Sequence, residues 1–311
     1  MKKISRNKYN FEQIDACDLC GSTTYVNFLL VEDRNYQTGE YQYVKCKKCE
    51  LVWLLVRPTE KSLQKHYPEN YRPYKRYAKT NKLQKLIRLV IKKNKFIAKI
   101  LIADQLFFWP KGKILDVGPG SGYYLHILKD WGWKVSGLEL SQKAVKMVKD
   151  SGFKEIYQGD MTTHKFPKNS FDVVRYSHVL EHVSSPRREL QKVRGVLKKG
   201  GNVLIIVPNI ESIFFRIFKG YWYPLEAPRH FYQFSPKTLT RLLLESGFHN
   251  IKIKYSQPPH TFLWSIFYRL GLHKSDVKFG YLVVPLIVVL KFSVFLKKTD
   301  VIEVVATKGN G

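Results

Sequence analysis

The chain has 311 residues, of which 44% are hydrophobic and 14% aromatic, a content that excludes global disorder. Its length suits one α/β domain with a small accessory module. Because 53 Lys and Arg stand against 25 Asp and Glu, the net charge is +28, which indicates an acidic partner such as nucleic acid, an anionic membrane surface or an acidic substrate. The basic start MKKISRNKYN is followed by no apolar run, so we expect no secretory signal and a cytoplasmic protein.

Two C-x2-C pairs lie near the N-terminus, Cys17 with Cys20 and Cys46 with Cys49, with 25 residues between the pairs. Zinc binds four thiolates in a tetrahedron, and each pair can supply two of them from one turn. The residues between the pairs resemble two strands around a polar turn, as in a zinc ribbon. We therefore expect a structural zinc module over residues 1–60. Two disulfides, or iron in a site of the same spacing, are the alternatives.

A basic connector is expected over residues 61–110. Thirteen Lys and Arg and a single acid, Glu69, lie between Lys61 and Lys99. Residues 81–103 have the period of an amphipathic helix, with apolar side chains on one face and lysines on the opposite face. Such a helix is typical of attachment to an anionic membrane surface, although packing on a sheet with solvated lysines would give the same pattern.

A glycine-rich turn follows the apolar strand expected at residues 113–117. Gly118, Gly120 and Gly122 lie in the sequence GPGSG, directly before a helix expected at residues 123–132. Glycines at such a turn let a ligand approach the backbone, and the start of a helix favours negative charge. Dinucleotide-binding folds use the same device, but Asp116 and Tyr123 stand where their fingerprint has an apolar residue and a third glycine.

Further strands alternate with helices along the next hundred residues. The strand at 134–139 ends in Glu139, which can accept the hydroxyls of a ribose, and the strand at 155–160 ends in Asp160, which can meet an adenine amino group. More strands are expected at 171–177, 202–208, 250–257 and 301–308. This alternation predicts an α/β fold with a doubly wound, mostly parallel sheet and a ligand at the carboxyl ends of the strands.

The motifs ILDVGPGSG, GLELS, QGD, FDVV and LKKGGNVLIIVPN resemble, in order and spacing, those of class I S-adenosylmethionine-dependent methyltransferases, over roughly residues 111–308. The resemblance implies a seven-stranded Rossmann-like sheet. It also implies that Asp116, Gly118, Gly120 and Gly122 surround the methionine part of S-adenosylmethionine, with Glu139 at the ribose and Asp160 at the adenine. Together with the cysteine pairs, the motifs are similar to bacterial sugar methyltransferases, although the further C-terminal domain of the deoxysugar C-methyltransferases is missing.

Four residues are candidates for chemistry at the acceptor. His178, Glu181 and His182 lie in HVLEHV directly after the strand at 171–177. His178 could line the donor pocket, while Glu181 and His182 could position or deprotonate an acceptor; capping of the next helix is the alternative role for all three. His230 lies in an aromatic stretch that resembles one branch of these methyltransferases. A neutral imidazole suits a general base, so His230 is the first choice, with a hydrogen bond within its loop as the alternative role.

Two apolar insertions interrupt the methyltransferase domain expected at residues 111–311, at about 210–231 and 258–299. The run at 281–296 contains Pro285 and Lys291 and is short for a membrane span. Since the strand at 301–308 must rejoin the sheet, a single crossing is excluded, and a re-entrant or surface-lying hairpin remains. A hydrophobic lid or a dimer contact would use the same residues.

The best interpretation is a methyltransferase that acts on a hydroxyl of a sugar, a lipid-linked glycan or glycolipid, or another small acceptor. The enzyme would bind structural zinc and would lie in the cytoplasm or peripherally on the inner face of the cell membrane. A ribosomal RNA methyltransferase with a zinc module is the second hypothesis, because +28 suits phosphate contacts. A non-catalytic donor-binding scaffold is the third. The sequence leaves open the acceptor, the choice between O-, N- and C-methylation, and the oligomeric state.

Overall fold

The computed structural model describes residues 10–34, 37–59, 62, 105–272 and 293–309. The predicted amphipathic helix at 81–103 and most of the apolar run at 281–296 lie outside the described residues. Among the helices of the described part, none is long and apolar enough to span a bilayer.

Seven strands form a mixed sheet in the order β12-β13-β10-β9-β6-β7-β8. Their bounds are β6 Lys113–Val117, β7 Lys134–Glu139, β8 Ile156–Gln158, β9 Phe171–Ser177, β10 Leu197–Pro208, β12 Phe248–Ser256 and β13 Val301–Lys308. Neighbours pair in parallel from β10 to β8, whereas β13 runs antiparallel to both β10 and β12. The predicted doubly wound Rossmann-like sheet is confirmed, with one reversed strand.

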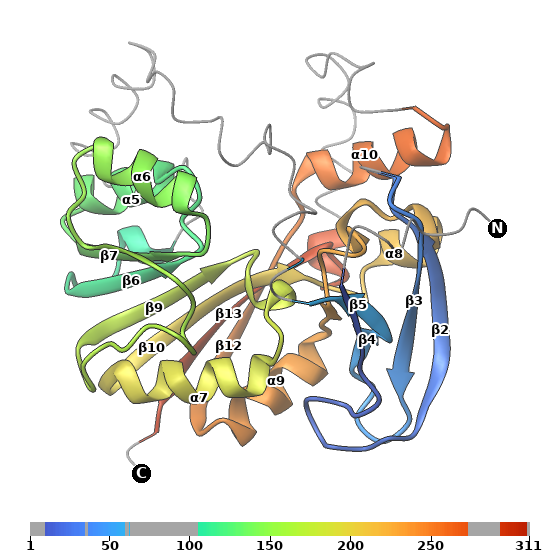
Figure 1. Cartoon of the computed structure of the whole chain (residues 1–311), viewed down its shortest axis with the longest axis horizontal. Coiled ribbons are helices and arrows are strands. Elements are labelled where there is room, and N and C mark those ends of the chain that lie inside the picture. The colour runs from blue at the N-terminus through green and yellow to red at the C-terminus, as the bar shows by residue number, and fades with distance from the viewer. Residues whose placement is uncertain (1–9, 35–36, 60–61, 63–104, 273–292, 310–311) are drawn as a thin grey trace.

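Helices cover both faces of this sheet. Figure 1 shows α5 and α6 on one side and α7 and α9 on the other. Their bounds are α5 Tyr123–Asp130, α6 Gln142–Asp150, α7 Pro186–Val196 and α9 Pro236–Glu245. Serine side chains cap three of them, since Ser141, Ser185 and Ser235 accept hydrogen bonds from backbone N–H groups of the first helical turn. The central strands β6 and β9 are largely buried because both faces of the sheet are covered.

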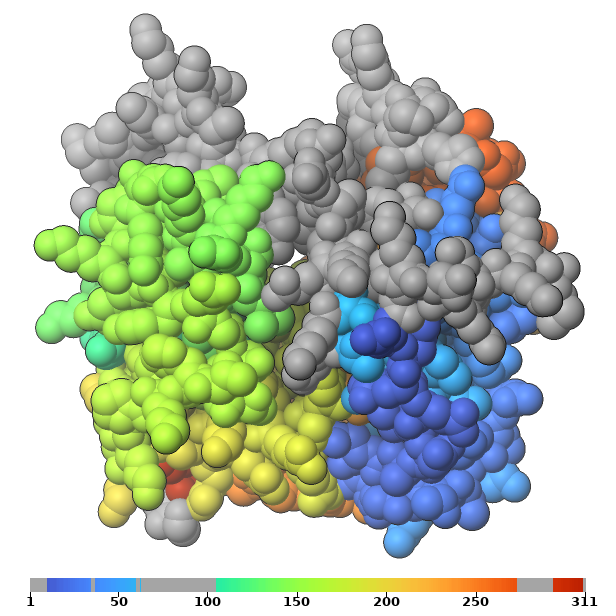
Figure 2. Space-filling model, in the orientation of Figure 1, coloured from blue at the N-terminus to red at the C-terminus, as the bar shows by residue number. Residues whose placement is uncertain are grey.

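The N-terminal residues form a second sheet that is completed from far along the chain. Its strands have the order β11-β4-β3-β2, while β1 and β5 pair separately. The bounds are β1 Phe11–Gln13, β2 Tyr25–Glu32, β3 Glu40–Cys46, β4 Val52–Leu54, β5 Val56–Pro58 and β11 Tyr232–Gln233. In the register, Trp53 of β4 lies opposite Tyr232 of β11. The N-terminal module and the methyltransferase part therefore share one sheet and one hydrophobic core, and Figure 2 shows their close packing.

The described parts of the two apolar insertions are short helical segments that pack on each other. They are α8 Ile213–Phe218, α10 Pro259–Arg269 and the single-turn helices η5 Lys219–Tyr221 and η6 Tyr223–Leu225. Two further single turns are η3 Gln105–Phe107 and η4 Leu180–His182. The buried Asp300 carboxylate accepts hydrogen bonds from Ser212, Trp222 and Thr261, at 2.5, 2.6 and 2.6 Å. One buried side chain thus connects both insertions next to β13.

Candidate active site

The glycine turn between β6 and α5 needs its glycines. Gly118, Gly120 and Gly122 all have positive φ angles, of 69°, 55° and 73°, a region that side chains rarely adopt. A Cβ atom on Gly118 would lie 2.5 Å from a methyl carbon of Val179. Because Val179 follows His178, this close approach places the glycine turn beside the HVLEHV segment.

Glu139 ends β7 directly at this turn. Its carboxylate is buried and accepts hydrogen bonds from the backbone N–H groups of Gly120, at 3.0 Å, and Ser141, at 2.9 Å. Burial raises the pKa of Glu139, against the opposing effect of these amides. The cradle of positive-φ glycines with a carboxylate at the end of the second strand fits the S-adenosyl donor that the sequence predicts.

Asp116 and Asp160 have different surroundings. The carboxylate of Asp116 is 1% exposed and accepts a hydrogen bond from Arg175 at 2.8 Å, while the guanidinium of Arg175 lies over the Tyr124 ring. Asp160 follows β8 and accepts hydrogen bonds from both Thr162 and Thr163. Although burial alone would raise the pKa of Asp160, these hydrogen bonds lower it. The sequence reasoning missed Arg175, whose only signal was a charge inside the apolar strand FDVVRYS.

His178 is placed at the end of β9 by an unusual backbone conformation. Its φ is 55°, in the left-handed region that is uncommon outside glycine and that often marks functional sites. The side chain is about half exposed, and its Nδ1 atom lies 3.4 Å from Oε1 of Glu181. Glu181 lies in η4 and is 0% exposed. Although burial alone would raise the pKa of Glu181, the neighbouring His178, His230 and His182 lower it below its usual value.

The loop that carries His230 is held against η4 by its backbone. The N–H of Phe231 donates to the carbonyl oxygen of Glu181 at 2.8 Å, and Nδ1 of His182 donates to the carbonyl oxygen of Arg229 at 2.8 Å. The two imidazole rings of His182 and His230 lie 4.6 Å apart, centre to centre. Nε2 of His230 lies 4.0 Å from Oε1 of Glu181. The structure therefore brings together all four predicted catalytic side chains, although they come from two distant segments.

His230 itself is buried and fixed in one tautomer. Its Nδ1 atom lies 2.7 Å from the carbonyl oxygen of Pro224, so this nitrogen must carry the proton. Burial, assisted by His182, lowers the pKa of His230 to about 4. The ring is therefore neutral at pH 7, and Nε2 presents a lone pair.

Residues of the N-terminal module also contact the loop that carries His230. The sequence did not predict these contacts. The Tyr43 hydroxyl donates its one proton to the carbonyl oxygen of His230, at 2.6 Å, and the hydroxyl oxygen lies 3.0 Å from the carbonyl oxygen of Leu225. Asp33 lies 3.5 Å from the guanidinium of the buried Arg229. No local pattern could have pointed to Tyr43, because its partners lie more than 180 residues away along the chain.

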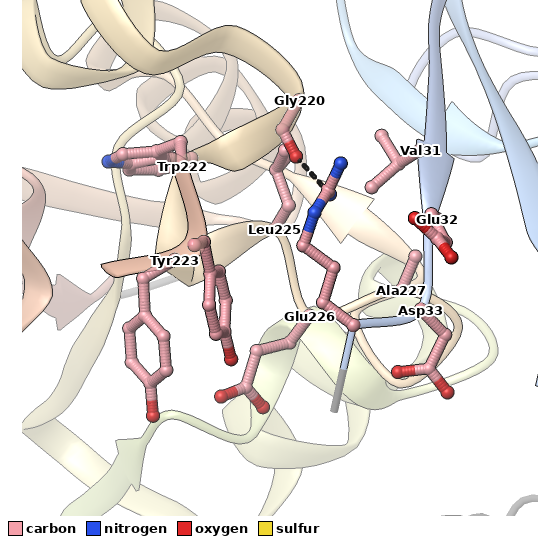
Figure 3. Close-up of a pocket in the computed structure, with 11 residues that line it drawn as sticks. Val31, Glu32, Asp33, Gly220, Trp222, Tyr223, Leu225, Glu226 and Ala227 are labelled. Atoms are coloured by element: carbon pink, nitrogen blue, oxygen red, sulfur yellow. Dashed lines mark hydrogen bonds between the residues drawn. The ribbon is translucent and has the colours of Figure 1, made fainter. Parts of the chain in front are cut away.

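A shallow pocket with a volume of about 10 Å³ lies between β2 and the first insertion. Figure 3 shows Glu32 and Asp33 on one wall and Trp222, Tyr223 and Glu226 on the other. Oε2 of Glu226 lies 4.0 Å from Nε2 of His230. This carboxylate therefore links the pocket to the histidine cluster.

The four cysteines form a second cluster, away from the sheet edge. They are free thiols, and one sulfur from each lies within 4.8 Å of the others. The Sγ–Sγ distances are 3.4 Å for Cys17 and Cys49 and 3.6 Å for Cys20 and Cys46. Tetrahedral zinc with Zn–S bonds of about 2.3 Å needs sulfurs about 3.8 Å apart, so the arrangement fits a metal better than two disulfides.

Asp18, inside the first cysteine turn, joins this cluster to the methyltransferase part. Its carboxylate accepts hydrogen bonds from the Ser185 hydroxyl, at 2.6 Å, and the backbone N–H of Arg187, at 2.9 Å, at the start of α7. The helix that follows HVLEHV is thus anchored on the cysteine module.

Comparison with known proteins identifies the family. The sequence pattern of a family described as "Methyltransferase domain" matches residues 74–253, more than half of the chain. An uncharacterized protein of Methanocaldococcus jannaschii is 28% identical over 148 residues, which are 46% of this chain and 67% of that protein.

Two quinone-related enzymes are similar over a shorter stretch. The ubiquinone biosynthesis O-methyltransferase of Coxiella burnetii is 28% identical over 133 residues, covering 41% of this chain and 54% of the enzyme. The demethylmenaquinone methyltransferase of Renibacterium salmoninarum is 32% identical over 109 residues, covering 34% and 45%. The chain thus spans about half the length of these two relatives.

Among solved structures, a SAM-dependent methyltransferase from Archaeoglobus fulgidus aligns with a TM-score of 0.47 and 21% identity, over 71% of this chain and 94% of that one. The glycine turn, the acid at the end of β7 and the match to the methyltransferase family all indicate a site for the methyl donor. The chain belongs to the methyltransferase domain family and is an S-adenosylmethionine-dependent methyltransferase.

Proposed function

We propose that the enzyme transfers a methyl group to a hydroxyl of a small acceptor, with a sugar or glycolipid as the expected class. The observation that carries this proposal is the fully buried Glu181 among His178, His182 and His230, next to the glycine turn through Val179. An alcohol is a poor nucleophile while protonated, so a cluster of this kind suits an oxygen acceptor. The name of the Coxiella burnetii relative, an O-methyltransferase, agrees with this choice.

The donor would be held by Gly118, Gly120 and Gly122, which let it approach the backbone, and by Glu139, whose carboxylate lies at the turn. Asp160 would meet the adenine from the end of β8. S-adenosylmethionine supplies an activated methyl group on a positively charged sulfur. The chain's contribution is alignment of the acceptor oxygen with that methyl group and removal of the acceptor proton.

His230 is the proposed general base. Its Nδ1–H group donates a hydrogen bond to the Pro224 carbonyl oxygen, so Nε2 is the atom that can accept a proton. Glu181, 4.0 Å from Nε2, would stabilise the resulting imidazolium. The half-exposed His178 can pass the proton on to solvent.

The cysteine cluster is proposed to bind a structural metal, with zinc the first choice and iron the alternative. Its role would be to hold the turn that carries Asp18 against α7, and thereby the module that contacts the His230 loop. Four closed thiolate ligands leave no open position for catalysis.

We also propose peripheral attachment to an anionic membrane surface. Support comes from exposed apolar side chains on the described parts of the insertions, namely Ile217, Leu270 and Phe295. Lipid-linked acceptors would be reached most easily from such a position.

Transfer of radiolabelled methyl groups tests the main proposal. Full-length protein is incubated with labelled S-adenosylmethionine and with panels of sugars, glycolipids, phenols and amines. We expect label in hydroxylated acceptors, and His230→Gln should lower kcat about 100-fold or more while the donor Kd changes little. Label in amines alone, or full activity of His230→Gln, would contradict the proposal.

A further inference from the structure

Glu181 is buried in a way that requires a cationic partner. Its side chain is 0% exposed, and in the described part of the structure neither carboxylate oxygen has a hydrogen-bond partner. An ionised carboxylate without such partners is costly to bury. The groups that approach it are imidazoles, with Nδ1 of His178 at 3.4 Å and Nε2 of His230 at 4.0 Å from its Oε1 atom.

The surrounding charges sharpen this requirement. The buried guanidinium of Arg229 lies between Asp33, at 3.5 Å, and Glu226, at 3.7 Å. Glu226 also lies 4.0 Å from Nε2 of His230. Glu181 and Glu226 therefore both lie beside the His230 ring.

The two neighbouring histidines are oriented like metal ligands. In His182 and in His230 the Nδ1 proton is given to a backbone carbonyl oxygen, that of Arg229 in the first case and that of Pro224 in the second. Such bonds fix the ring and the tautomer of metal-binding histidines, and they leave Nε2 with the lone pair. One ligand atom from each of Glu181, His182 and His230 lies within 4.8 Å of the other two.

We propose that Glu181, His182 and His230 bind a divalent metal ion, with Zn²⁺ the best match to this donor set. Two imidazoles and one carboxylate are a known catalytic zinc set that keeps its fourth position open. Tetrahedral bonds of about 2.0–2.1 Å need ligand atoms about 3.3 Å apart. The 4.0 Å between Nε2 of His230 and Oε1 of Glu181 closes to that distance by small side-chain rotations. This site is separate from the four-cysteine cluster and differs from it in ligand chemistry.

The role of this metal rests on the proposed transfer to a hydroxyl. The acceptor oxygen would occupy the fourth position, where the cation lowers the pKa of its O–H group. The O–H bond breaks and its proton passes to His178 and then to water. An oxygen lone pair forms the bond to the methyl carbon while the carbon–sulfur bond breaks, and that electron pair stays on sulfur as a neutral thioether. With metal bound, His178 rather than His230 receives the proton.

Metal content of the full-length protein gives the direct test. Protein is stripped with chelator, reloaded with excess Zn²⁺, dialysed and analysed by mass spectrometry of the metal. We expect Glu181→Gln and, as an independent variant, His230→Gln to hold one zinc fewer per chain than wild type, with affinity at this site lowered by more than about 100-fold. His249→Gln, on β12, is the matched control and should keep the full content.

Cobalt substitution separates the two clusters. Co²⁺ bound by cysteine thiolates absorbs strongly through sulfur-to-metal charge transfer, which Co²⁺ bound by nitrogen and oxygen lacks. In Cys46→Ser protein we expect the thiolate band to be reduced and the weaker nitrogen–oxygen spectrum to remain. That spectrum should disappear in Glu181→Gln. Donor binding by each variant, measured by calorimetry, shows that it is folded.

Identical zinc content in wild type and in both cluster variants would overturn the metal site. If Glu181→Gln then still lost methyl transfer, the histidine–carboxylate base of the proposed function would stand without a metal. If the metal were present but no hydroxylated acceptor were methylated, the proposed function would fail and the metal site would remain.

Discussion

The hydroxyl of Tyr43, on strand β3 of the N-terminal module, donates a hydrogen bond to the backbone carbonyl oxygen of His230, with 2.6 Å between the oxygens. Burial raises the pKa of Tyr43, so the hydroxyl keeps the proton that it donates. The hydroxyl oxygen of Tyr43 in turn accepts a hydrogen bond from the Gln233 side chain. A residue of the cysteine module thus fixes the position of the proposed base.

Tyr43→Phe is expected to reduce methyl transfer more than donor binding. The change leaves the buried carbonyl oxygen of His230 without this donor, which costs about 1–3 kcal/mol of folding free energy, whereas the Leu225 carbonyl still accepts from Gln233. Urea denaturation, donor calorimetry and kcat measure the three effects. Tyr255→Phe, on strand β12, serves as the control. A variant with lower stability but wild-type kcat would show that Tyr43 does not position His230.

Gly120→Arg should abolish donor binding while the fold survives. At φ 55° the residue lies in a region that favours glycine, and its N–H contacts Glu139, so an arginine side chain would fill the donor's approach to the turn. Calorimetry with S-adenosylmethionine checks this expectation. The matched control is Gly195→Arg on α7, where nothing lies within 4 Å of a Cβ atom. Unchanged affinity of Gly120→Arg would contradict the placement of the donor.

Cys46→Ser should release metal from the four-cysteine cluster and loosen a distant loop. Structural zinc contributes directly to folding, so its loss should unfold the cysteine turns first. Because Asp18 holds α7 and β4 pairs with β11, hydrogen exchange should rise around residues 185–188 and 230–234 as well. Metal analysis returning no zinc or iron in wild-type protein would remove the structural metal. If the rise in hydrogen exchange were confined to residues 10–58, the cysteine module would not be coupled to the loop that carries His230.

Asp300→Asn is predicted to weaken binding of the acceptor while binding of the donor changes little. The Asp300 carboxylate accepts hydrogen bonds from both insertions, and an amide nitrogen cannot accept them, so each buried donor left without a partner costs about 1–3 kcal/mol. We expect a lower melting temperature and a higher acceptor KM with little change in donor Kd. Asp172→Asn is the control, because Asp172 and its partner Lys198 are each more than a third exposed and such pairs contribute less than about 1 kcal/mol. Equal effects of the two changes would refute this role of Asp300.

The sheet could be predicted because its signals are local. An apolar strand, a turn residue and a capped helix follow each other within about twenty residues, and β6, β7 and β9 lie where the sequence placed them. Pairs that depend on distant residues had no such signal. The reading of the cysteine region predicted β2 and β3, but β11 has two residues and is a strand only because β4 lies beside it. For the same reason HVLEHV and His230 were separate candidates, and their meeting at Glu181 became visible only in three dimensions.

The pairing of β4 with β11 also sets an order of events during synthesis. β4 ends at residue 54, and β11 begins at residue 232, so the ribosome adds almost 180 residues before the N-terminal sheet can gain its last strand. Contacts this distant along the chain close slowly, because the intervening loop must first be brought together. Until then the edge of β4, with its buried Trp53, faces the surroundings unpaired, and exposed edges of that kind invite aggregation. The N-terminal module is made early, yet its sheet is among the parts of the chain that must be completed late.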